Sequence, residues 1–72
     1  MRKIEAQQAI LREWNIWRPA NITQDQKSTG HEGFLFFLSI KSDISVKIPY
    51  QWNGDPWQEI KVWLMKAREI SD

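Results

Sequence analysis

The stretch from Phe34 to Trp52 constrains the fold more than any other part of the sequence. Residues 34–40 read Phe-Leu-Phe-Phe-Leu-Ser-Ile, and residues 44–52 then alternate large apolar side chains with polar or prolyl ones. An alternation with a period of two over this length is typical of a half-buried strand. Residues 41–43 are polar and supply a turn between the two segments. The pattern therefore predicts an antiparallel β-hairpin.

The register of this hairpin follows from the side chains that each loop length would pair. A two-residue loop would place Lys41 opposite Ile44 and so mix polar and apolar residues on one face. A three-residue loop gives one wholly apolar face, and a slip of one residue would move every side chain to the other face. Its pairs are Ile40 with Ile44, Leu38 with Val46, Phe36 with Ile48 and Phe34 with Tyr50. In this register Leu35 and Phe37 point away from the apolar face.

Two amphipathic helices flank the predicted hairpin. The first is expected over residues 3–17, where the apolar residues fall in a stripe roughly 140° wide that also contains Gln7. Pro19 is expected to end this helix. The second begins with Asp55 as N-cap and Pro56 in the first turn, and Gln58 is placed to complete a capping box. Its apolar stripe continues to Ile70.

The predicted architecture is one small α+β domain over residues 1–72. Its elements are a helix, an antiparallel β-hairpin and a second helix, with both helices packed on one face of the sheet. Residues 18–33 form a mainly polar connection with one large apolar residue, Ile22, and two interpretations of them stay open. Residues 20–23 add a third strand at the edge, or the segment folds back over the rear of the hairpin.

Composition excludes several classes of function. The chain has 72 residues, no cysteine and one histidine, so disulfides, thiolate metal sites and histidine-rich metal sites are excluded, and we expect no metal or cofactor. Ten Lys and Arg residues against nine Asp and Glu residues are too balanced for a dedicated binder of duplex DNA. The amino terminus does not resemble a signal peptide, and no apolar run could span a membrane. We therefore expect a cytoplasmic protein with no membrane partner.

The sequence contains no recognisable catalytic constellation. His31 and Glu32 lie between two glycines, but neither a second histidine nor a paired carboxylate lies nearby to complete a site. Five tryptophans could stack on bases or sugars, but each lies on an expected core face, at Trp14, Trp17, Trp52, Trp57 and Trp63. The protein is therefore not expected to be an enzyme.

Exposed apolar residues predict a protein-binding or adaptor module. Leu35 and Phe37 are adjacent on the uncovered face of the hairpin, a pattern that indicates a docking surface. The partner-binding residues that we expect are Leu35, Phe37, Lys47, Val62 and Met65. The partner is another protein or a second copy, joined as a homodimer through the hairpin face.

The alternative is a nucleic-acid-binding protein that uses the hairpin and the second helix. Its expected contacts are Lys41, Lys47 and Lys61 with phosphates and Trp52 with a base. Binding of this kind weakens as the salt concentration rises, and that dependence separates the two hypotheses.

Overall fold

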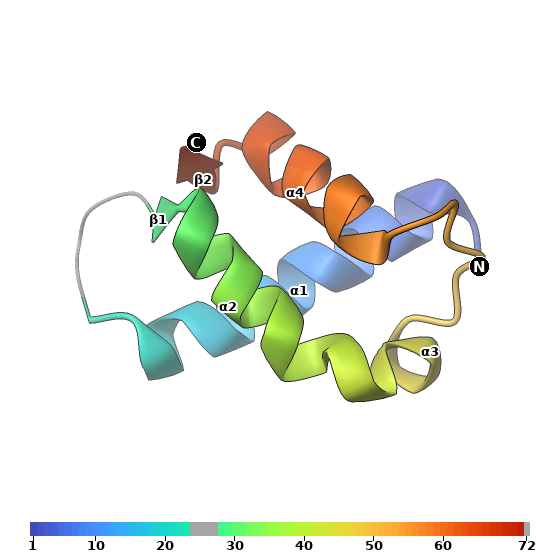
Figure 1. The fold of residues 1–72 in the computed structure, drawn as a ribbon, viewed down its shortest axis with the longest axis horizontal. Helices are drawn as coiled ribbons and strands as arrows, with labels where there is room; N and C mark the ends of the chain where they lie inside the picture. Colours follow the sequence, from blue (N-terminus) through green and yellow to red (C-terminus); the bar gives the residue numbers. More distant parts are fainter. Residues whose placement is uncertain (24–27, 72) are drawn as a thin grey trace.

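The computed structural model describes residues 1–23 and 28–71. Its elements in chain order are α1 (Lys3–Asn21), β1 (Ser28–Thr29), α2 (Gly30–Ile40), the 3-10 turn η1 (Lys41–Asp43), α3 (Ile44–Lys47), α4 (Pro56–Lys66) and β2 (Ile70–Ser71). In Figure 1, α2 and α4 lie side by side, and α1 crosses behind them. The chain thus forms a small helical fold with principal extents of 33 × 21 × 18 Å.

Residues 30–40 form a helix where the sequence predicted the first strand of a hairpin. Thr29 begins it with a reciprocal capping box: its hydroxyl accepts a hydrogen bond from the Glu32 N–H (3.3 Å), and the Glu32 carboxylate accepts one from the Thr29 N–H (2.9 Å). Gly33, Phe36, Phe37 and Ile40 are buried, which is the spacing of one helical face. The predicted α+β hairpin fold is therefore wrong.

Residues 44–52 are also not a strand among the described residues. Ile44–Lys47 makes the single turn α3, and the backbone N–H of Ile48 donates to the Ile44 carbonyl at 2.8 Å. The chain then continues without regular structure to α4, with Ile48 fully buried and Pro49 and Gln51 exposed. Of the alternating apolar residues, Ile48 is buried and Ile44, Tyr50 and Trp52 pack against the helical core, whereas Val46 is 81% exposed.

Helix α1 is longer than the sequence predicted, because Pro19 lies inside its last turn. A proline in a helix leaves the carbonyl four residues earlier without a donor. Here that residue is Asn15, which is exposed, so water can hydrate its carbonyl. The next carbonyls are satisfied locally: the Asn21 side-chain amide donates to the Trp17 carbonyl (2.8 Å), and the Ile22 N–H donates to the Arg18 carbonyl (2.7 Å). The helix can continue through Pro19 because the proline lies in the last turn and the carbonyl left without a donor, that of Asn15, is on an exposed residue.

A two-residue parallel pairing replaces the predicted third strand. Residues 20–21 belong to α1, and β1 pairs with β2 through Ser28 with Ile70 and Thr29 with Ser71. Arg68, at φ 59°, follows α4 in the left-handed conformation. Residues 24–27, part of the segment proposed to cover the hairpin, lie outside the described residues.

The turn after α4 is a Schellman motif. The Glu69 N–H donates to the Leu64 carbonyl (2.9 Å), and the Arg68 N–H donates to the Met65 carbonyl (3.0 Å). The Trp14 indole donates to the Glu69 carboxylate at 3.0 Å and ties this turn to α1.

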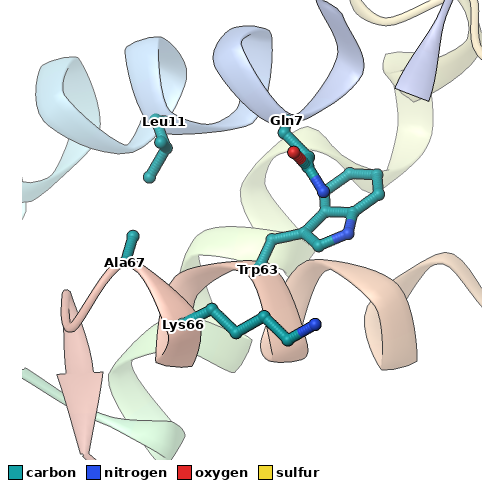
Figure 2. A pocket seen from close by; sticks show the side chains of 5 residues that line it. All are labelled: Gln7, Leu11, Trp63, Lys66 and Ala67. Atoms are coloured by element: carbon teal, nitrogen blue, oxygen red, sulfur yellow. The ribbon is translucent and has the colours of Figure 1, made fainter. Parts of the chain in front are cut away.

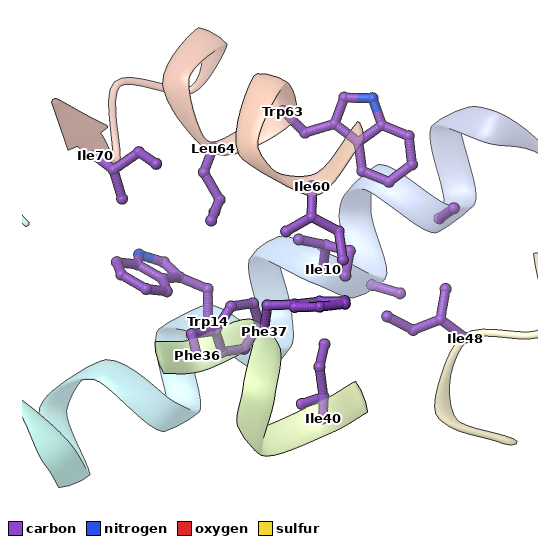
Figure 3. Packing of buried hydrophobic residues seen from close by; sticks show 12 residues of the cluster. Ile10, Trp14, Phe36, Phe37, Ile40, Ile48, Ile60, Trp63, Leu64 and Ile70 are labelled. Carbon is purple, nitrogen blue, oxygen red and sulfur yellow. The ribbon is translucent and has the colours of Figure 1, made fainter. Parts of the chain in front are cut away.

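The core lies between the three long helices and contains no sheet face. Figure 3 shows that Ile10 and Trp14 of α1, Phe36 and Phe37 of α2, and Ile60 and Leu64 of α4 point toward one another. Ile48 and Ile70 close the two ends of this cluster. The expected sheet with both helices on one face is absent, since β1 and β2 have two residues each.

The predicted start of the last helix is confirmed. The Asp55 carboxylate accepts a hydrogen bond from the Trp57 N–H at 3.0 Å, and Pro56 occupies the first turn. The second cap contact involves a residue other than the expected one: the Glu59 carboxylate, and not Gln58, accepts a backbone N–H, that of Asn53 (3.1 Å).

Candidate binding surfaces

An apolar face is formed on α2 and α4 by side chains that point away from the core. Because α2 buries one side of its helix, Phe34, Leu35 and Leu38 occupy the other side. Val62 and Met65 lie on α4, which packs against α2. These five side chains are between 38% and 47% exposed. We call Phe34, Leu35, Leu38, Val62 and Met65 the apolar face.

Aromatic contacts fix the part of the apolar face that joins the two helices. The ring of Phe34 lies 5.3 Å from that of Trp57, in an edge-to-face arrangement across the α2–α4 contact. Phe37 lies 5.8 Å from Trp57 and 6.2 Å from Phe34, and it connects these rings to the core. Edge-to-face pairs at such distances add stability beyond their burial. The exposed rings are thus held by the fold.

The structure separates the five residues predicted to bind a partner. Leu35, Val62 and Met65 are exposed and belong to the apolar face. Phe37 is only 5% exposed, so its predicted place on the surface is wrong. Lys47 lies on α3, where its ammonium group is 3.3 Å from the Glu13 carboxylate, and it lines a different hollow together with Ile16 and Trp17 of α1. Sequence reasoning missed Phe34 and Leu38 because the hairpin register placed them inside.

The residues predicted to bind nucleic acid lie on separate elements. Lys41 is in η1, Lys47 in α3 and Lys61 in α4. Trp52 precedes α4, with its ring 4.9 Å from Tyr50 and 5.5 Å from Trp63. Its indole N–H is buried and finds no acceptor among the described residues. The hairpin that was to carry Lys41 and Lys47 does not exist.

A groove lies between α1 and α4 and meets the apolar face at Val62, which belongs to both surfaces. It consists of two adjoining hollows that share Trp63 and Lys66. One hollow, of about 220 Å³, is lined by Gln7, Leu11, Trp63, Lys66 and Ala67. The other, of about 350 Å³, is lined by Lys3, Tyr50, Asn53, Gln58, Glu59, Val62, Trp63 and Lys66. We call these two hollows the α1–α4 groove.

Two side chains, a polar one and a short one, keep α1 and α4 from packing closely along the α1–α4 groove. Gln7 is half-buried on α1, next to the buried Ala6, and Figure 2 shows its amide beside the Trp63 indole. Further along, Leu11 and Ala67 point toward each other across the gap, and the alanine side chain is too short to fill it. A large apolar residue at either position would close a tightly packed interface.

The phenol of Tyr50 stands at the wider hollow with a perturbed acidity. Burial raises its pKa above the ordinary value of 10.0, and the Glu59 carboxylate raises it further through its negative charge and a hydrogen bond. Tyr50 also packs edge-on against Trp63, with ring centroids 5.9 Å apart. The phenol is therefore kept neutral and is positioned by its neighbours.

The candidate catalytic residues have a structural role or stand apart. Glu32 caps α2, and His31 is exposed in the first turn of that helix. Over residues 1–23 and 28–71, no three His, Cys, Asp or Glu side chains cluster closely enough to hold a metal ion. None of the described helices combines the length and apolar character needed to cross a membrane.

The comparisons with known proteins add no family to this description. No protein-family model, curated protein or solved structure matches the chain.

Proposed function

We propose that this protein is a small, non-enzymatic binding module that self-associates through the apolar face. The observation that supports the proposal is the exposure of five large apolar side chains on two helices that pack together, Phe34, Leu35 and Leu38 on α2 and Val62 and Met65 on α4. Such a surface on a soluble domain is a candidate for a protein contact. A domain of 72 residues also gains stability when a folded copy binds another.

The size of the apolar face determines how strong this association can be. Five side chains with about two fifths of their surface exposed present roughly 350 Å² of apolar area. If about 60% of an interface is apolar, this corresponds to roughly 600 Å² per copy. Stable interfaces bury about 800 Å² per partner, so a weak dimer is expected, with a dissociation constant of roughly micromolar order or weaker.

Sedimentation velocity over a wide range of protein concentration tests the proposal. The wild-type protein should shift from monomer to dimer as concentration rises. Leu35→Glu and Leu38→Glu should keep it monomeric, because a carboxylate in an apolar interface is left desolvated and unpaired. Val46→Glu is the matched control, since Val46 is 81% exposed on α3 and outside the apolar face. A wild-type monomer at the highest concentration, or a Val46→Glu protein that dissociates equally, would contradict the proposal.

A further inference from the structure

We propose that the α1–α4 groove binds a short acidic and apolar segment of another protein, with its carboxylates at Lys3 and Lys66 and an apolar side chain over Trp63. The groove shares only Val62 with the apolar face, and one copy of the protein supplies its whole lining, so its use does not require self-association. Three properties of its lining support this occupant: a fixed apolar floor, amide side chains that make no hydrogen bond to another described residue, and lysines that form no ion pair among the described residues.

The floor of the groove is preorganised. Trp63 is only 6% exposed and is held between α4 and the rings of Tyr50 and Trp52. Leu11 and Ala67 extend this apolar floor along the seam between the helices. A surface that is already rigid loses little conformational freedom when a ligand binds.

The walls of the groove offer hydrogen bonds suited to a polypeptide. Gln7, Asn53 and Gln58 line the two hollows, and their side-chain amides make no hydrogen bond to another described residue. A carboxamide carries both donors and an acceptor, so it can pair with either group of a peptide unit. Three such amides along one groove match the repeated N–H and C=O groups of a bound chain.

The charges at the groove favour an acidic segment over a basic one. Lys3 and Lys66 both line the wider hollow, and neither lies within ion-pairing distance of a carboxylate among the described residues. The carboxylate of Glu59, also in this hollow, already accepts the Asn53 N–H and interacts with the Tyr50 phenol. Lys3 and Lys66 can together form ion pairs with one or two carboxylates of a bound segment. A nucleic-acid strand normally requires more phosphate contacts than two lysines can supply.

Selection from a phage-displayed library of random short peptides tests this inference. The baits are the wild-type protein and Leu38→Glu, the variant expected to remain monomeric, so a failure of self-association does not affect the outcome. Ala67→Phe, which fills the narrow hollow, serves for counter-selection. We expect the retained peptides to be enriched in Asp or Glu together with Leu, Ile or Phe, and to bind both baits equally.

Calorimetry on a synthesised, selected peptide completes the test. Binding should weaken at least tenfold in the Lys3→Glu, Lys66→Glu double variant and in Ala67→Phe, and it should weaken as salt rises. Lys41→Glu is the matched control, because Lys41 lies on η1 outside the groove, and it should bind as the wild type does. The inference is overturned if no peptide survives counter-selection, if the survivors lack acidic residues, or if a single-stranded oligonucleotide binds instead and is lost in the same variants.

Discussion

Replacing Phe37 by alanine should destabilise the protein far more than replacing Leu35 by alanine, although a hairpin would place both on the same face. Phe37 is 5% exposed and packs on the rings of Phe34 and Trp57, whereas Leu35 is 41% exposed. Loss of a buried phenylalanine costs about 3–5 kcal/mol. A partly exposed leucine on a helix costs about 1 kcal/mol or less, since alanine is also the better helix former.

Urea unfolding followed by far-ultraviolet circular dichroism measures both losses at low protein concentration. A domain of this length is expected to have a total stability of about 4–11 kcal/mol, so Phe37→Ala removes a large share of it. With an m-value of about 1 kcal/mol/M, its midpoint should fall by about 3 M or more, and that of Leu35→Ala by about 1 M or less. Equal losses in the two variants would refute the helical assignment of residues 30–40.

Three further predictions concern caps and acidity. Thr29→Ala should lower the free energy of unfolding by about 1 kcal/mol because the Glu32 N–H loses its acceptor, and Thr29→Ser should restore it; identical stabilities in urea would exclude this cap. Arg68→Gly should raise the free energy of unfolding by up to about 1 kcal/mol, and with it the urea midpoint, because glycine adopts the left-handed conformation without strain. A lower urea midpoint would be inconsistent with φ 59° at this position. Tyr50 is the single tyrosine, so its phenolate absorbance should show that it ionises above pH 10 in the folded protein. The free energy of unfolding should fall as pH rises past 10, because there the tyrosine of the unfolded chain ionises more readily than that of the folded protein. Glu59→Gln should lower the pH midpoint of the phenolate titration partway toward 10, and an unchanged titration would exclude a role for the Glu59 carboxylate.

The beginning of α4 could be predicted because its signals are local. Asp55 and Pro56 act within one turn of the chain, and their roles at an N-terminus do not depend on what packs against the helix. The amphipathic stripe of α1 was predicted in part: Ile10 and Trp14 are buried, but Ile4 is 55% exposed and Ala6 and Ala9 are buried instead. The end of α1 was not, because the effect of Pro19 depends on whether the carbonyl of Asn15 can reach water.

The run from Phe34 to Ile40 is ambiguous, because a short and almost wholly apolar segment suits a buried strand and a buried helix equally. Two signals favoured the helix. Thr29 and Glu32 have the spacing of a capping box, and Gly33, Phe36, Phe37 and Ile40 have the spacing of one helical face. Residues 44–52 then had no strand to pair with, so their alternation could not form a hairpin.

The candidate surfaces could be predicted only in part, because each depends on tertiary packing. Val62 and Met65 were identified from the helical period of α4 alone. The position of Leu35 was correct for the wrong reason, since a strand and a helix both turn it outward. The α1–α4 groove left one trace in the sequence, Gln7 within an apolar stripe, but its partner Trp63 lies more than fifty residues away, a separation that no local pattern reports.

Backbone NMR of the isolated protein tests the helical fold, on which both proposed surfaces depend, most directly. The account predicts helical Cα chemical shifts and sequential amide contacts from Gly30 to Ile40, and no backbone contact between Leu38 and Val46. Extended shifts over this segment, with cross-strand contacts between Leu38 and Val46, would contradict it.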